Sequence, residues 1–134
     1  MIENITHNNK KLALIVRNSY LKNKGVNFFT NNKLSQQVAY MSHRKGHLIQ
    51  PHIHKKRLKK IYDSCEVLII IEGSLKVNFY TNNKKFLFNK ILNKNDIIIL
   101  LTGGHGFEVL KNCKFIEVKQ GPYNPTKDKF KFYN

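Results

Sequence analysis

Short apolar runs separated by turn residues are the feature that most constrains the fold of this chain. The runs are rich in Val, Ile, Phe and Tyr, which favour strands, and they recur roughly every ten residues. None shows the apolar periodicity of an amphipathic helix over a helix-length window. We therefore expect strands over residues 12–16, 26–29, 34–43, 48–54, 66–71, 74–81, 84–92, 96–101, 107–110 and 114–119.

Two of these runs indicate how the strands are buried. Leu75, Val77 and Phe79 alternate with polar neighbours, as in a hairpin strand with one buried face, and Asn82-Asn83 suits the tight turn that follows. Residues 97–101 are apolar on both faces, so they should be covered on both sides, in a barrel wall or at a subunit contact. Many short strands of this kind predict an all-β sandwich or barrel.

A length of 134 residues predicts one domain over 1–134, with a core at about 34–120 and N-terminal strands within 10–30. The tail, 121–134, carries alternating aromatic residues and should dock as an edge strand or tail. Residues 1–30 contain no pattern of a cleavable signal sequence, and no apolar run reaches membrane-helix length. Cys65 and Cys113 are too few for a disulfide framework, which favours a cytoplasmic location.

The formal net charge is +16, which would attract nucleic acid, anionic membranes or small anions. The surplus is spread along the chain, however, and only three of the 24 basic residues are Arg, the residue favoured for planar phosphate recognition. A solvated, lysine-rich surface is the simpler interpretation. We therefore expect no specific nucleic-acid partner and no membrane association.

The candidate site begins with His52 and His54. If residues 49–54 form a strand, these two imidazoles point to the same face, as two neighbouring ligands of a metal do. Glu66 and His105, on later strands or strand ends, would supply a third and fourth ligand. The alternatives stay open: the histidines as structural strand residues, and Glu66 as an exposed carboxylate paired with a lysine.

The same residues resemble the two motifs of the cupins, small jelly-roll β-barrels. Gly46, His52, His54, Glu66 and Gly73 follow the order of the first motif, and His105 with Phe107 matches the end of the second. The likeness covers roughly residues 34–120. Two departures are a basic insertion at 55–60, which delays the carboxylate, and Leu100 and Thr102 where the family usually has Pro and Gly.

This resemblance implies an all-β, cupin-like jelly roll that holds one divalent metal ion, Fe, Mn, Zn or Ni, on His52, His54, Glu66 and His105. It allows dioxygenases, isomerases, epimerases, lyases and non-catalytic binders. Because lysines of the 55–60 stretch would ring the barrel mouth, we expect a small anionic or sugar-like substrate. A nucleotide-sugar isomerase or epimerase of surface-polysaccharide synthesis, in the RmlC-like branch, is one specific candidate. A homodimer is also expected.

Two further residues are candidates for catalysis. Glu117 lies in an apolar strand, and if it faces the barrel interior, burial would raise its pKa toward that of a general acid or base. The alternative is an outward Glu117 beside Lys119 on a solvated face. Tyr123 follows the strand-breaking Gly121-Pro122 and would fold over the barrel mouth as a lid, or lie in a plain C-terminal turn.

Overall fold

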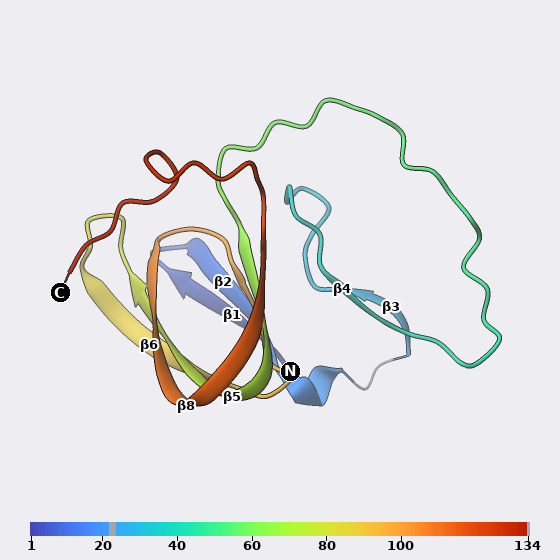
Figure 1. Cartoon of the computed structure of the whole chain (residues 1–134), viewed down its shortest axis with the longest axis horizontal. Helices are drawn as coiled ribbons and strands as arrows, with labels where there is room; N and C mark the ends of the chain where they lie inside the picture. Colours follow the sequence, from blue (N-terminus) through green and yellow to red (C-terminus); the bar gives the residue numbers. More distant parts are fainter. Residues whose placement is uncertain (22–23, 134) are drawn as a thin grey trace.

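The computed structural model describes residues 1–21 and 24–133, and these residues are built mainly of antiparallel strands (Figure 1). Lys22 and Asn23, within the expected N-terminal strand region, and Asn134, at the end of the expected tail, lie outside the described residues. The elements are β1 (Ile2–His7), β2 (Lys10–Val16), the 3₁₀ turn η1 (Asn18–Tyr20), β3 (Gly25–Phe28), β4 (Ala39–Ser42), β5 (Glu66–Tyr80), β6 (Phe86–Asn93), β7 (Ile97–Leu100) and β8 (Gly104–Lys119). No helix in these ranges is long and apolar enough to cross a membrane.

The long strand β5 organises the main sheet. Its first half pairs with β7 and its second half with β6, while β8 runs antiparallel to it along the other edge. The order β1-β2-β7-β5-β6 completes the sheet, and β3 pairs only with β4 in a separate hairpin. Residues 66–71 and 74–81, which the sequence predicts as two strands, are one continuous strand, and so are 107–110 and 114–119.

The β5–β8 ladder bends sharply in its middle. Its register shifts between Ile70 and Leu75, at bulges around Gly73 and opposite Lys111 and Lys114. Figure 1 shows both strands curving together into a U, so that their two ends face each other across an open mouth. The turn before β7 holds the inner side of this bend, because Ile70 donates its N–H to the carbonyl of Asp96 and accepts one from Asn95. The bend places the two ends of the β5–β8 strand pair around one cavity.

The core consists of two clusters on opposite faces of β7. Ile98 and Leu100 pack with Leu68, Leu75 and other residues inside the U. Ile99 packs into the second cluster, with Val16, Val67 and Phe29 among its members. The expectation that residues 97–101 are covered on both sides is therefore confirmed within the chain itself. The alternation of Leu75, Val77 and Phe79 is confirmed as well, since all three are buried.

The prediction of a strand at residues 48–54 is wrong. Residues 43–65 contain no regular secondary structure and form an extended arm that projects from β4 and returns to β5 (Figure 1). Of the expected strand at 34–43, only Ala39–Ser42 forms. Alternation in sequence specifies which side chains share a face, but a strand also needs a neighbour for its backbone groups. The arm has no such neighbour among the described residues.

Two smaller features also differ from the sequence-based expectation. β1 was not predicted, because Ile2–His7 is largely polar, and it forms through its pairing with β2. In the turn between β5 and β6, the left-handed backbone conformation is adopted by Lys84, not by Asn82 or Asn83. The wide turn is closed by backbone hydrogen bonds between Thr81, Lys84 and Lys85.

Candidate functional site

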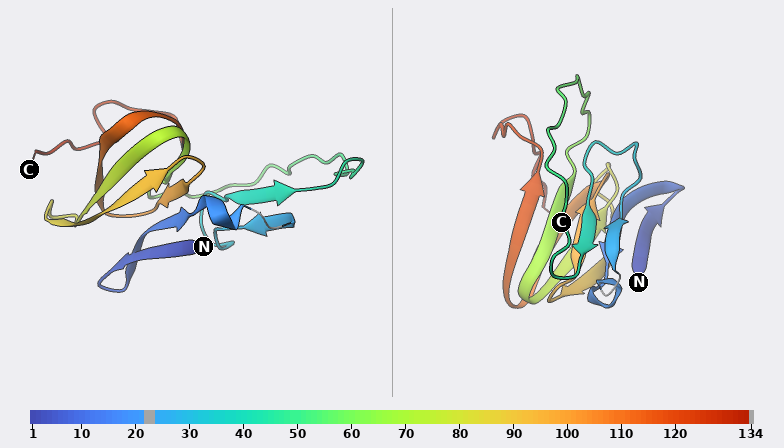
Figure 2. Two further views of the ribbon diagram at one scale, coloured as in Figure 1. Left: turned by 90° about the horizontal axis from the view of Figure 1, so that it is seen from below. Right: turned by 90° about the vertical axis from the view of Figure 1, so that its right-hand side faces the viewer.

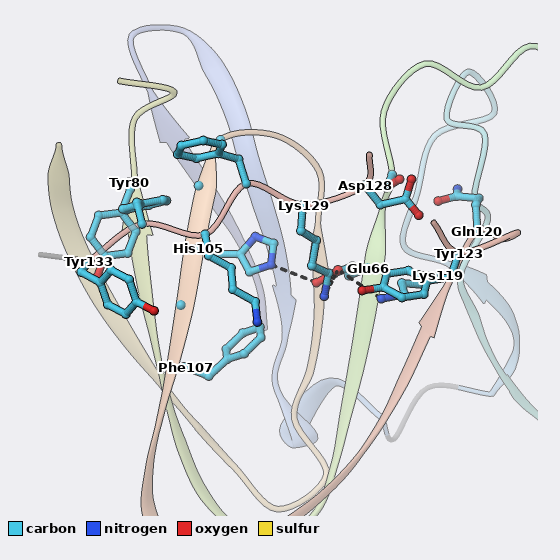
Figure 3. A pocket seen from close by; sticks show the side chains of 17 residues that line it. Glu66, Tyr80, His105, Phe107, Lys119, Gln120, Tyr123, Asp128, Lys129 and Tyr133 are labelled. Carbon is cyan, nitrogen blue, oxygen red and sulfur yellow. Dashed lines mark hydrogen bonds and ion pairs between the residues drawn. The ribbon is translucent and has the colours of Figure 1, made fainter. Parts of the chain in front are cut away.

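A pocket of about 530 Å³ lies at the mouth of the U (Figure 3). Both ends of the β5–β8 strand pair and the C-terminal tail contribute to its wall. Its lining combines ionisable and aromatic side chains, among them Glu66, His105, Lys119, Tyr123, Lys129 and Phe130. A cavity of this size suits a small molecule, since ligand pockets commonly measure roughly 300–1,000 Å³.

Glu66 and His105 meet at the centre of the pocket. The Nε2 atom of His105 lies 2.9 Å from Oε2 of Glu66, although 39 residues separate them. Glu66 is buried at the start of β5, and His105 is half-buried near the start of β8. Their side chains meet because the bend brings these strand ends together across the mouth. The result is a carboxylate–imidazole pair open to a cavity.

Two ammonium groups complete the surroundings of Glu66. Nζ of Lys129 lies 3.7 Å from Oε1 of Glu66, and Nζ of Lys119 lies 3.9 Å from the same atom. Figure 3 shows Lys129 reaching from the tail toward Glu66. The hydrogen bond from His105, and then the charges of His105, Lys129 and Lys119, hold the pKa of Glu66 below its ordinary value of 4.5, against the opposing effect of burial. Glu66 is therefore ionised at neutral pH.

Aromatic rings and the tail form the rest of the wall. The ring of His105 is tilted against that of Phe107 at 5.4 Å, and Nζ of Lys119 lies 5.1 Å from the ring centre of Tyr123. Phe132 packs edge-on against Tyr80 at 5.2 Å. The expectation that the tail docks is confirmed for residues 128–133, which line the pocket, but these residues form no edge strand. Tyr123 lines the pocket and is 58% exposed, and its role as a lid stays a prediction.

Glu117 is exposed, contrary to the expectation that it is a buried general acid or base. It lies opposite Leu68 and so shares the interior face of the U, but that part of β8 is open to solvent. Oε1 of Glu117 lies 2.9 Å from Nζ of Lys119, an ion pair that raises the pKa of the lysine. The solvated alternative therefore describes Glu117, although it faces inward.

His52 and His54 are not brought to the pocket. Both lie exposed on the arm, where their rings are 5.2 Å apart and Nδ1 of His52 is within 2.9 Å of the carbonyl oxygen of Gln50. Within 1–21 and 24–133, no three His, Cys, Asp or Glu side chains converge as metal ligands do. In addition, the ammonium groups of Lys119 and Lys129 would repel a divalent cation beside Glu66. As arranged here, these residues do not fit a metal ion.

Sequence reasoning missed the two lysines of the site. Lys129 lies in a polar tail with many other lysines, and Lys119 was noted only as a neighbour of Glu117. Cys65 is buried and Cys113 half-buried, both as free thiols, and burial raises the pKa of both. His43 and His47 stack face to face on the arm, with ring centroids 4.0 Å apart.

No family profile matches the chain, and no solved structure matches it. Germin-like proteins 2-1 and 2-3 of Oryza sativa subsp. japonica are 37% and 33% identical to it, each over 73 residues. The aligned segment is 54% of this chain, and the chain spans only about a third of the length of these curated relatives. Germin-like proteins are cupins, so the similarity supports the cupin superfamily, though not the RmlC-like branch in particular. This similarity and the antiparallel strands described above together identify the fold as an all-β, cupin-like jelly roll.

Proposed function

We propose that this cupin-like chain binds a small anionic or sugar-like molecule in the pocket at the barrel mouth, and moves a proton on it through Glu66 and His105. One observation carries the proposal: an ionised, buried carboxylate is hydrogen-bonded to an imidazole inside a cavity of ligand size. Pairs of this kind recur where a histidine acts as a general acid or base, because the carboxylate fixes the tautomer and orientation of the ring.

The proton-transfer step depends on which ring nitrogen of His105 is hydrogen-bonded to Glu66. When Nε2 of His105 donates its proton to Glu66, Nδ1 carries the lone pair and is the atom that accepts a proton from a ligand. No residue in the described part of the chain forms a hydrogen bond to Nδ1. The ionised Glu66 also stabilises the imidazolium that results. His105 would thus abstract a proton at Nδ1 and return it to a neighbouring atom of the ligand.

The wall of the pocket favours an anionic ligand with a flat or ring-shaped body. Lys129 and Lys131 offer positive charge at the rim, and the overall net charge of +16 steers anions toward the protein. Tyr123 and Phe130 offer apolar ring faces against which a sugar or a base packs. A phosphorylated or nucleotide-linked sugar combines these properties.

Within this class, an isomerisation or epimerisation fits the dyad, because both need only proton removal next to a carbonyl and return of the proton at another position. A nucleotide-sugar isomerase or epimerase remains the specific candidate that the cupin resemblance suggests. The test uses a nucleoside-diphosphate 4-ketosugar in D₂O, with NMR measuring deuterium incorporation next to the carbonyl.

We expect deuterium exchange with the unaltered chain, and a loss of about a hundredfold or more in His105→Asn and Glu66→Gln. His47→Asn, on the arm, should exchange at the unaltered rate. Ligand binding by calorimetry without any exchange would make the pocket a non-catalytic binding site. If no phosphorylated sugar binds to the chain or undergoes deuterium exchange, the proposal is wrong.

A metal-dependent activity is the second candidate, and one observation favours it. Glu66 and His105, two of the four ligands expected from the sequence, already meet. The other two, His52 and His54, would reach Glu66 and His105 only if the arm moved over the mouth of the pocket. The repulsion from Lys119 and Lys129 leads us to favour the metal-independent dyad.

A further inference from the structure

A second cavity, of about 660 Å³, lies beside the pocket described above. The turn between β1 and β2 and the turn between β5 and β6 contribute two of its sides, and Thr102 and Gly103 contribute a third. Figure 2 (left) shows the two turns, in blue and in yellow, at the end of the molecule opposite the tip of the arm. Neither Glu66 nor His105 lines this cavity.

A closely packed partition separates the two cavities. Tyr80 and Gly103 line both of them. A Cβ atom at Gly103 would lie 3.0 Å from the carbonyl oxygen of Tyr80, and one at Gly104 would lie 3.1 Å from Cβ of Tyr80. Phe132, which lines the first pocket, packs edge-on against the ring of Tyr80. Because contacts this tight leave no passage for a ligand, the second cavity is a separate site and not an extension of the first.

The lining of the second cavity combines an apolar wall with hydrogen-bonding groups. Leu12 belongs to the first core cluster and Leu87 packs against it, so the apolar wall is anchored in the core. The Oγ1 atom of Thr81 accepts a hydrogen bond from the backbone N–H of Lys85, which leaves the hydroxyl proton of Thr81 for a ligand. The cavity can therefore hold a molecule with one apolar and one polar end.

Two lysines from different hairpins give this cavity its positive charge. Lys10 follows the turn between β1 and β2, and Lys85 precedes β6. Within 1–21 and 24–133, neither forms an ion pair, whereas the lysines of the first pocket lie close to Glu66. Asp63 is the one acidic residue in the described lining, and it pairs with neither lysine. Two ammonium groups without a carboxylate partner attract an anion of matching charge.

We propose that the second cavity binds a small phosphate monoester with a ring-shaped body, such as a nucleoside monophosphate. A phosphate monoester carries a charge of about −1.5 to −2 at pH 7, which Lys10 and Lys85 balance, and its oxygens accept hydrogen bonds. Lysine binds phosphate as a point charge and needs no planar geometry. The body of the ligand packs on Leu12, Leu87 and the ring of Tyr80. The volume of about 660 Å³ suits such a molecule.

Calorimetry at low salt with adenosine monophosphate (AMP) tests the site. The unaltered chain is compared with a double variant, Lys10→Gln with Lys85→Gln. Lys94→Gln with Lys111→Gln is the matched control, because it removes two exposed lysines that do not line the cavity. Lys129→Gln reports binding in the first pocket. Adenosine and inorganic phosphate are titrated separately, so that the contributions of the ring and of the phosphate can be compared.

We expect AMP to bind the unaltered chain, with a Kd that rises about fivefold or more in the Lys10→Gln, Lys85→Gln variant and changes less than about twofold in the other two. Adenosine and phosphate should each bind at least about tenfold more weakly than AMP, because each makes only part of the contacts. In amide NMR spectra of the unaltered chain, AMP should shift Thr81 and Thr102 more than His105.

Four results would overturn the proposal: no binding of AMP, AMP binding no tighter than adenosine or phosphate alone, an equal loss in the matched control, or a loss in Lys129→Gln in place of the double variant. An equal loss in the control would mean attraction by net charge alone. These readouts do not involve proton transfer by Glu66 and His105, so they are independent of the proposed function.

Discussion

The backbone of Gly73 on β5 passes directly against that of Asn112 on β8. A Cβ atom at residue 73 would overlap the carbonyl oxygen of Asn112 and lie 2.8 Å from Cα of Cys113. Gly73 also adopts a φ of +82°, in the left-handed region that favours glycine. This close crossing is the point at which the β5–β8 ladder bends, so one glycine controls the approach of Glu66 to His105 at the far ends of the strands.

Gly73→Ala should therefore destabilise the fold and separate the dyad. The left-handed conformation costs about 1–2 kcal/mol with a side chain, and the overlap with rigid backbone adds about 1–3 kcal/mol. We expect a loss of about 3 kcal/mol in the free energy of unfolding, measured by urea denaturation. Gly25→Ala is the matched control, because Gly25 has a φ of +81° with open space around it. Equal losses in the two variants would show that the crossing at Asn112 is not tight.

Glu66→Gln should change the dependence of stability on pH. The folded-state pKa of Glu66 lies below its ordinary value of 4.5, so its contribution is fully present above about pH 4.5 and is lost as the pH falls through the folded pKa. We expect Glu66→Gln to cost about 1–3 kcal/mol near pH 7, with a difference that shrinks toward pH 3. Urea denaturation at several pH values measures it. A difference that stays constant down to pH 3 would contradict an ionised Glu66 in a stabilising contact.

Lys129→Gln should weaken the binding of an anionic ligand. Nζ of Lys129 lies in the pocket, 3.7 Å from Oε1 of Glu66, and its removal lowers the positive charge at the rim. We expect the Kd for a nucleoside-diphosphate sugar to rise about three- to tenfold and its salt dependence to fall, measured by calorimetry at two ionic strengths. Lys94→Gln, in the turn before β7, is the control. If both variants bind alike, Lys129 takes no part in recognition.

Metal content distinguishes the dyad from a metal centre. For the dyad we expect less than one equivalent of divalent metal in protein purified without a tag, and exchange in D₂O that survives EDTA. The metal content and the exchange rate of His52→Ala and His54→Ala should then equal those of His47→Ala. Stoichiometric metal that the first two variants lose and His47→Ala keeps would establish the four-residue metal site instead.

Binding to nucleic acid should be weak and unselective. Only three of the 24 basic residues are Arg, and the lysines are distributed along the chain. Fluorescence anisotropy with labelled RNA and DNA oligonucleotides should show binding at low salt that disappears near physiological salt. Tight, sequence-selective binding at that salt would contradict a small-molecule function.

The sequence by itself determined the all-β class, the buried alternation in β5, the two-sided burial of β7 and the docking of the tail. These features depend on the local pattern of apolar side chains, which the chain carries whatever its neighbours are. It also identified Glu66 and Gly73 as residues of the first cupin motif and His105 as a residue of the second. Only the tertiary structure decided which of the expected ligands meet. His52 and His54 lie on an arm without a partner strand, and Lys129 reaches the site from a tail more than 60 residues away from Glu66. Pairing of strands and docking of a tail depend on contacts between distant segments, and periodicity in sequence carries no information about them.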